Sequence, residues 1–443
     1  MRTFAILAIL SSIISVLQGQ SPAPLRLSLD EAIQRGMRSN LGIAERESQS
    51  QIVRAERLRA LSSLLPTVNG SIGENVQRNN LAVFGFRFPG VPQIIGPFGY
   101  SDIRAFADVD LYNRASRLRL KAAKENLRVE DLNMADARDL VVQAVANAYL
   151  SIIAANARVD AARSESATAQ ALYERAKELH TAGVTSGIDE LRAEVEWKTR
   201  QQQVLIAQNE FAKGKLTLAR VIGLPTGQDF ELADQAPYAP LEGLTAEQIS
   251  ERARSSRSDY LSLKAQLDAA QIRRQAASAQ RLPVLAAGGN YGANGVNTAQ
   301  LYRTFAFTGS IKMNLFDGGR IQADVAEADA QIYARKAEIA DLERQIDWEI
   351  RTALLDLRSA SDQVAVAEEN LALAQATLEQ ARGRFSAGVS DNIEVVQAQD
   401  SVAGSQERLI NSRYAHNLAK VSLARAVGMA ETNLKQFMGS GAR

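Results

Sequence analysis

A seven-residue repeat of large and small apolar side chains runs through two long, proline-free stretches of the chain. In the clearer stretch, one heptad position holds Ile350, Leu357, Val364, Leu371, Leu378 and Phe385, and the position three residues later holds Ala353, Ala360, Ala367, Ala374 and Ala381. Large residues that alternate with alanine let two helices approach closely and interlock. A helix over 114–179 would be about 100 Å long, because each residue adds about 1.5 Å. The pattern therefore predicts long coiled coils.

The same pattern occurs twice, which predicts an internal duplication. Ala182-Gly183-Val184 matches Ala387-Gly388-Val389 at an offset of about 205 residues, and Leu111-Tyr112-Asn113 matches Leu315-Phe316-Asp317 at nearly the same offset. We therefore expect two tandem repeats, 20–232 and 242–443, joined by a proline-containing linker at 233–241. Each repeat is predicted to contain one antiparallel coiled-coil hairpin, over approximately 113–222 and 317–427.

Between the coiled-coil stretches, the hydrophobic period changes to two. Phe305, Phe307 and Ile311 alternate with polar residues such as Thr304 and Thr308. We expect strands over approximately 66–77, 101–112, 283–294 and 303–316. Such alternation is typical of outer-membrane strands, yet four strands cannot close a barrel by themselves. On periodicity alone, soluble hairpins that cap a coiled coil explain the pattern equally well.

The N-terminus predicts export. Arg2 precedes an apolar run from Phe4 to Leu17, followed by the small residue Gly19, which is typical of a secretory signal peptide over 1–19. The alternative is an N-terminal helix buried in the core. The chain has no cysteine, so disulfides, thiolate metal sites and a lipoprotein anchor are all excluded. Because 51 Lys+Arg face 50 Asp+Glu, a strongly basic nucleic-acid binder is also excluded.

No motif in the chain points to catalysis, a cofactor or a metal. The sequence lacks a Walker lysine motif, an HExxH motif and a Ser/His/Asp order. The two histidines, His180 and His416, fall at seam positions that match Phe385 and Phe211, and are expected to be packing or interface residues rather than ligands. We therefore expect a protein that is not an enzyme.

The turns at the ends of the two predicted hairpins carry the same short pattern. In structural terms, Gly183 and Gly388 end the outgoing helices, while Ser186 with Asp189, and Asp391 with Glu394, fit capping boxes that open the return helices. In functional terms, two matched tips offer a docking point for a partner. In a symmetric oligomer their acidic residues would also form a ring that selects cations.

The order of these motifs resembles the TolC-like outer-membrane efflux protein family over essentially the whole mature chain. The residues that carry the match are Leu27-Ser28-Leu29-Asp30-Glu31-Ala32, Leu64-Leu65-Pro66, Leu315-Phe316-Asp317-Gly318-Gly319-Arg320 and the two Ala-Gly-Val tips. The resemblance implies a mainly α fold with a small β part. It also implies a homotrimer in the bacterial outer membrane, with one 12-stranded β-barrel and an α-helical tunnel through the periplasm.

The resemblance further implies a passive exit duct that works with a periplasmic adaptor (membrane fusion) protein and an inner-membrane pump. It places the periplasmic gate at Asp189, Phe385, Glu394 and Gln397, where some members carry a second acid in place of Gln397. The adaptor-contacting tips would be Ala182, Gly183, Val184, Thr185, Ala387, Gly388, Val389 and Ser390. Two alternatives remain open, namely the exit duct of a type I protein secretion system and a periplasmic coiled-coil adaptor or scaffold without a channel.

Overall fold

A computed structural model of the protein describes residues 25–85, 89–225, 227–234, 238–239, 246–387, 389–390 and 392–439. The predicted signal peptide (1–19), most of the predicted linker (233–241), Gly388 and Asp391 lie outside the described residues. The chain forms two compact units. The helical unit comprises Met1–Asn40, Arg138–Ala246 and Ile350–Arg443, and the sheet unit comprises Leu41–Ala137 and Glu247–Glu349. Each unit therefore combines segments from both predicted repeats.

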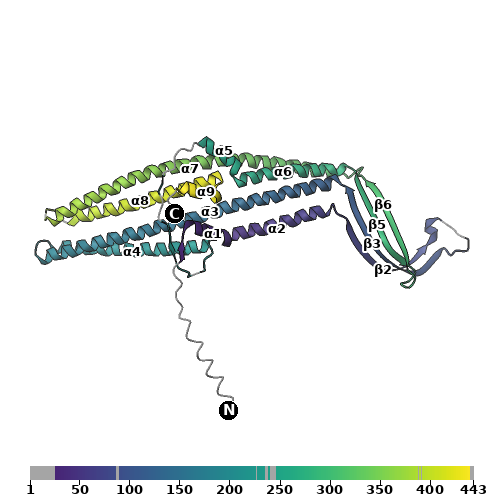
Figure 1. Ribbon diagram of the computed structural model, residues 1–443, viewed down its shortest axis with the longest axis horizontal. Helices are drawn as coiled ribbons and strands as arrows, with labels where there is room; N and C mark the ends of the chain where they lie inside the picture. The colour runs from purple at the N-terminus through teal and green to yellow at the C-terminus, as the bar shows by residue number, and fades with distance from the viewer. Residues whose placement is uncertain are drawn as a thin grey trace, which may run out of the picture. The chain divides into compact units, whose positions relative to one another are not determined.

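Two very long helices dominate the mainly helical fold. Helix α3 (Arg114–Thr181) has 68 residues and α7 (Arg320–Ser386) has 67, so each is about 100 Å long. In the helical unit, α4 (Gly187–Val221) returns beside α3 as the first hairpin, and α8 (Asn392–Val427) returns beside α7 as the second hairpin (Figure 1). The predicted seams are confirmed by the burial of Val145, Ile152, Val159, Ala169, Ala176, Ile350, Ala353, Leu357, Ala360, Val364, Ala367, Leu378 and Ala381.

Part of α3 is apolar enough to cross a membrane by composition. One window of this helix has a mean hydropathy of 1.5, but 56% of that window is buried within the protein. Val145 and Ile152, at 0% and 1% exposure, belong to the seam of the first hairpin. This burial is typical of a core helix, whose apolar face is covered by neighbouring helices.

The start of the described chain is fixed to α3. Strand β1 (Leu25–Leu27) pairs in parallel with β4 (Phe230–Leu232), and α1 (Leu29–Ser39) opens with a capping box formed by Ser28 and Glu31. The Tyr149 hydroxyl of α3 donates to the Leu27 carbonyl oxygen at 2.9 Å and lies 3.0 Å from Asp234 Oδ2. A short C-terminal helix, α9 (Ala430–Met438), completes the helical unit.

The sheet unit carries a four-stranded antiparallel sheet in the order β2-β3-β5-β6 (Figure 1). Its strands are β2 (Thr67–Asn80), β3 (Ile94–Tyr112), β5 (Val284–Gly295) and β6 (Tyr302–Lys312). The unit also contains α2 (Leu41–Ser62), α5 (Ala246–Ser256) and α6 (Ser258–Ser278), with 3₁₀ turns η1 (Leu81–Phe84) and η2 (Ala279–Arg281). In this order, β2 and β6 are the edge strands.

The pairing register gives the sheet one apolar face and one polar face. Ile72 pairs with Ile103, Ala105 with Tyr291, and Tyr291 with Phe305; directly paired residues share a face, and alternate residues along a strand lie on the same side. The apolar face therefore holds Val68, Ile72, Ile103, Tyr291, Phe305, Phe307 and Ile311, and the opposite face holds Asn69, Ser71, Arg104, Asp108, Asn290, Thr304 and Thr308. Ile72 and Phe307 on the apolar face are 83% and 82% exposed.

Three of the predicted strand limits are wrong, the first being that of β2, which ends at Asn80 rather than at 77. Strand β3 begins at Ile94 rather than at 101, because its early residues pair with the end of β2, up to Asn80 opposite Ile94. Strand β6 ends at Lys312 rather than at 316, because its last partner is Val284, and the residue before Val284 is Pro283, which lacks the N–H needed to extend the ladder. Phe316 is accordingly 91% exposed and outside the sheet.

Candidate functional site: the hairpin tips and the groove between the hairpins

The first hairpin turns through exposed residues directly after α3. The Val184 N–H donates to the Leu179 carbonyl oxygen at 2.9 Å, which closes the last turn of the helix. Gly183 has a φ of +72°, a left-handed conformation that glycine adopts without the steric cost of a Cβ. This geometry leaves Val184 65% exposed, with Ala182 and Gly183 exposed beside it and Thr185 half-buried.

The return helix α4 does not open with the predicted capping box. Ser186 occupies the N-cap position, but its side chain makes no cap hydrogen bond to the backbone. Its hydroxyl donates to Asp189 Oδ2 at 3.1 Å, a charge-assisted hydrogen bond. Asp189 Oδ1 also lies 3.7 Å from Arg192 Nη1, and the Asp189 side chain is only 16% exposed. The Asp189 charge is therefore balanced locally at the start of α4.

The second tip exposes a valine in the same way. The Val389 N–H donates to the Arg384 carbonyl oxygen at 3.0 Å, and Val389 is 70% exposed. Ala387 is exposed and Ser390 half-buried. The predicted capping box of Asp391 with Glu394 involves a residue outside the described part of the chain. Glu394 Oε2 lies 3.2 Å from Arg384 Nε, so an ion pair joins α7 to α8 across this tip.

A polar contact also joins the two helices of the first hairpin. His180 Nδ1 lies 2.6 Å from Glu190 Oε2, and the His180 side chain is 47% exposed. The ring lies beside Gly187, where an added Cβ would come within 3.3 Å of Nε2. His180 therefore does not pack within the chain as Phe385 does, because the Glu190 carboxylate holds the imidazole at the surface of the hairpin; a role at an interface between copies stays a prediction.

The predicted gate residues fall into two groups. Phe385 is 5% exposed and belongs to an apolar tip cluster that joins α3, α7 and α8; its members are Leu172, Leu378, Ala381, Phe385, Val395 and Ala398. Asp189 also faces the second hairpin, because its carbonyl oxygen accepts a hydrogen bond from Asn392 Nδ2 at 3.2 Å. Glu394 and Gln397, in contrast, are exposed on successive turns of α8. Asn392, which was not predicted from the sequence, is fully buried and bonds to the first hairpin.

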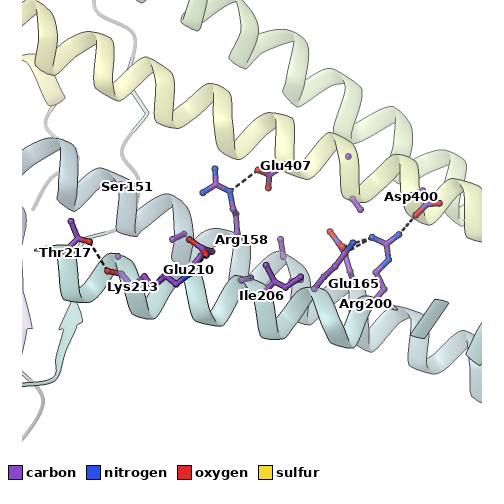
Figure 2. Close-up of a pocket in the computed structure, with 18 residues that line it drawn as sticks. Ser151, Arg158, Glu165, Arg200, Ile206, Glu210, Lys213, Thr217, Asp400 and Glu407 are labelled. Carbon is purple, nitrogen blue, oxygen red and sulfur yellow. Dashed lines mark hydrogen bonds and ion pairs between the residues drawn. The ribbon is translucent and has the colours of Figure 1, made fainter. Parts of the chain in front are cut away.

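Farther along the hairpins from the tips, a groove of about 800 Å³ is lined by α3, α4 and α8. Figure 2 shows Arg200 reaching from α4 towards Glu165 on α3 and Asp400 on α8. The Arg200 side chain is 7% exposed; its Nε lies 2.5 Å from Glu196 Oε1, its Nη1 lies 3.2 Å from Glu165 Oε2, and its Nη2 donates to Asp400. Together these four residues form the Arg200 cluster, which ties the two hairpins together.

A second tie lies beside the Arg200 cluster. Arg158 Nε on α3 donates to Glu407 Oε1 on α8 at 2.9 Å (Figure 2). Both side chains are partly exposed, at 36% and 48%. Three polar contacts therefore join α8 to the first hairpin, at Asn392, Asp400 and Glu407.

Burial perturbs the ionisable groups of the Arg200 cluster. Burial raises the pKa of the Glu165 carboxyl, and the nearby Arg200 charge offsets only part of that effect. Burial by itself would lower the pKa of Arg200, but the hydrogen bond that Arg200 donates to Glu196 and the surrounding carboxylates raise it above its ordinary value. A sequence signal for this cluster exists, since Arg200 occupies a small-residue heptad position between Ala193 and Ala207.

A pair of buried basic residues lies elsewhere on α8. His416 is 0% exposed, as its predicted packing role requires, and its ring lies 4.9 Å from the ring of Tyr238. Lys420 is 1% exposed and donates to the Ala239 carbonyl oxygen at 2.5 Å. Burial, together with the Lys420 charge, lowers the pKa of His416 to about 4, and burial lowers the pKa of Lys420 to about 8.

These sites consist of ion pairs and packing contacts between helices. Among the residues that the structure describes, no group of three or more His, Cys, Asp or Glu side chains could hold a metal ion.

Comparison with known proteins places the chain in a family. The family model described as outer membrane efflux protein matches residues 33–224 and 249–429. The outer membrane protein TolC of Vibrio cholerae is 22% identical over 397 residues, covering 87% of this chain and 86% of the relative. The outer membrane protein OprJ of Pseudomonas aeruginosa is 27% identical over 339 residues, covering 72% of this chain and 68% of the relative.

Solved structures share the fold. The outer membrane protein VceC of Vibrio cholerae has a TM-score of 0.77 at 17% identity, over 90% of this chain and 96% of VceC. The CusC structure has a TM-score of 0.76 at 20% identity, over 94% of this chain and 95% of CusC. With the family model matched over most of the sequence, the chain belongs to the outer membrane efflux protein family and serves efflux across the outer membrane.

Proposed function

We propose that three copies of the chain form one passive exit duct for efflux. Their four-stranded sheets would close into a single 12-stranded barrel in the outer membrane, and their helical units would line a tunnel in the periplasm. The observation that carries this proposal is the sheet, which exposes an apolar face and leaves both of its edge strands, β2 and β6, without a partner strand among the described residues.

The physical argument rests on the environment of the strands. A four-stranded sheet cannot curl into a closed barrel, and in lipid every unpaired backbone N–H and C=O group costs several kcal/mol. Pairing β2 of one copy with β6 of the next satisfies both edges. The apolar face, with Ile72 and Phe307 more than four-fifths exposed, then contacts lipid, and the face with Asn69 and Thr308 lines a polar channel.

Neighbouring residues on β6 test this arrangement. Phe307→Lys places a charge on the apolar face, where it should cost about 2–4 kcal/mol near the bilayer centre. Thr308→Lys, the control, places the same charge on the opposite face. We expect Phe307→Lys to reduce the trimer recovered from outer membranes, and Thr308→Lys to assemble normally and alter the ion selectivity of the channel in planar bilayers. Equal assembly of both variants would refute the proposed orientation.

At the other end of the duct, we propose that the hairpin tips form the gate. Asp189 and Phe385 would hold the two hairpins of each copy together. The Asp189 carbonyl oxygen accepts a hydrogen bond from Asn392 of the second hairpin, and Phe385 belongs to the tip cluster that includes Leu172 of the first hairpin. Glu394 and Gln397 are exposed on α8 and would face the channel axis, with Glu394 forming an acidic ring. Glu394→Gln should therefore lower the preference for cations, measured as a shift in reversal potential under a salt gradient.

The exposed tips would also contact a periplasmic adaptor, which in turn binds an inner-membrane pump that supplies the energy. Val184 and Val389 are the strongest candidates, because each is at least 65% exposed at the end of its hairpin. Ala182, Gly183, Thr185, Ala387 and Ser390 flank them, and Gly388 would complete the second tip. Changing Val184 and Val389 to Asp should abolish efflux in cells and leave the conductance of the purified trimer unchanged. Unchanged efflux would exclude the tips as the adaptor site.

A further inference from the structure

A cavity with both polar and apolar walls lies between the two hairpins, next to the Arg200 cluster. It has a volume of about 120 Å³ and is lined by residues from all four helices, among them Glu165, Thr168, Arg200, Gln375, Gln399 and Gln406. Gln399 is 7% exposed, and neither its amide nitrogen nor its amide oxygen has a hydrogen-bond partner among the described residues. Leaving a buried amide unpaired is costly. A cavity of this size has room for several water molecules, each of which takes up about 30 Å³.

Apolar contacts lie on either side of this polar layer. Towards the tips, the tip cluster includes Leu378 on α7 and Ala398 on α8. In the other direction, within the second hairpin, Val364 and Ala367 on α7 pack with Leu409 on α8. The cavity residues Gln375 and Gln406 fall between these two clusters in sequence. Water is therefore favoured at this level, between the apolar tip cluster and the apolar seam of the second hairpin.

The ion pair between Arg200 and Asp400, which joins the two hairpins, can break at a low cost in free energy. Arg200 is buried, but two of its carboxylate partners, Glu165 and Glu196, belong to its own hairpin. If Asp400 moves away, Arg200 keeps both of these partners, so no buried charge is left unpaired. The side chain of Asp400 is 62% exposed and can return to water directly.

We propose that the level of Gln399 and Asp400 is a hydrated joint, at which the two hairpins of one copy separate and rejoin when the duct opens and closes. Water molecules bound to the Gln399 amide fill the cavity between the hairpins. When the hairpins separate, Asp400 exchanges its bond to the Arg200 guanidinium for bonds to water. This inference rests on the proposed function of the chain as a duct that opens at its tips. It assigns a water site and a positioning role to Gln399, Arg200 and Asp400.

Two substitutions at adjacent residues should shift opening in opposite directions. Gln399→Leu keeps a similar shape but removes the groups that bind water, so the joint becomes apolar and the closed state gains stability. Asp400→Asn keeps the shape but removes the charge that ties α8 to Arg200. We expect the ratio of open to closed time of single trimers in planar bilayers to fall about threefold in Gln399→Leu and to rise about threefold in Asp400→Asn, a change typical of one partly exposed ion pair.

Glu210→Gln is the matched control. Glu210 lines the groove of about 800 Å³ that Asp400 also lines. Its partner is Lys213 of the same helix, with Oε1 and Nζ 3.0 Å apart, so the loss of the Glu210 charge should leave opening unchanged. The thermal midpoint of each trimer is measured alongside, and Gln399→Leu is expected to melt at the same temperature as the wild type or higher. If the ratio of open to closed time shifts in the same direction in Gln399→Leu and Asp400→Asn, or stays unchanged in both, the proposed hydrated joint is overturned. A wild-type protein that forms no conducting trimer would instead overturn the proposed function itself.

Discussion

Replacing His416 with phenylalanine should make the helical unit less sensitive to acid. His416 is fully buried on α8 between the Tyr238 ring, 4.9 Å away, and the buried ammonium of Lys420. Among the described residues, neither ring nitrogen has a partner at full hydrogen-bond geometry, and the nearby Asn417 side chain raises the pKa of His416 less than burial and Lys420 lower it. The matching position in the first half of the chain is Phe211, so a phenyl ring is the natural replacement for an imidazole that packs without using its polar atoms.

The size and sign of the effect follow from the pKa of His416. Burial, and then the Lys420 charge, lower it from 6.5 to about 4 in the folded protein. Between these pH values the unfolded chain binds the proton and the folded chain does not, so stability falls as the pH drops from 6.5 to about 4. At about 1.36 kcal/mol for each pKa unit, the full loss is about 3 kcal/mol per chain. At pH 7 the neutral imidazole contributes none of this loss.

The measurement is thermal unfolding followed by circular dichroism, in detergent, for wild type and His416→Phe across this pH range. A difference of about 3 kcal/mol corresponds to roughly 5–10 °C in the melting temperature of a large domain. We expect the two proteins to diverge by this amount as the pH falls, since titrating carboxylates affect both equally. His180→Gln is the control, because His180 is half-exposed and bonded to Glu190. If His416→Phe loses as much stability in acid as the wild type, the assigned pKa of His416 is wrong.

Three further changes test packing at the hairpin seams and tips. Changing Ala374 and Ala381, both 6% exposed, to Leu should lower efflux without reducing trimer assembly, because the larger side chains would hold the seam in one register. Normal efflux in cells would count against this reasoning. Gly183→Ala should destabilise the protein by about 1 kcal/mol because of its positive φ, whereas Gly383→Ala, in a helix with open space around it, should stabilise it by a similar amount; thermal melting distinguishes the two. Asn392→Ala should cost about 1–3 kcal/mol in a urea titration by removing a buried hydrogen-bond donor from the Asp189 carbonyl, and a smaller cost would mean that water replaces the amide.

The helical seams could be predicted from the sequence because their signal is strictly periodic. Ile350, Leu357 and Val364 follow a seven-residue period, and a helix of 67 residues repeats that signal many times. The faces of the sheet could be predicted for the same reason, since the alternation around Phe305 and Phe307 survives in the observed pairing. Strand limits could not, because they depend on where a partner strand ends, as at Lys312 opposite Val284.

The polar ties could be predicted only in part. Arg200 stands out in the sequence as a charge at an alanine position, but its partners lie on two other helices, and Asp400 is 200 residues further along the chain. The bonds of the tip residues were harder still, because a carboxylate such as Glu394 can bond to a helix N-terminus or to a nearby arginine. Which bond forms depends on helix rotation, which a sequence pattern does not determine to within one side chain. The structure pairs Glu394 with Arg384.

The contacts within each hairpin differ from those between the two hairpins in a way that suits a gated duct. Within a hairpin, apolar seam residues such as Val364 and Leu409 pack tightly, and separating them would expose apolar surface at a cost of about 25 cal/mol per Å². Between the hairpins, Asp400 and Glu407 supply partly exposed carboxylates, and exposed ion pairs are worth about 0–1 kcal/mol each. Any motion that opens the tips should therefore move each hairpin as a rigid body, and should be resisted mainly by the tip cluster around Phe385.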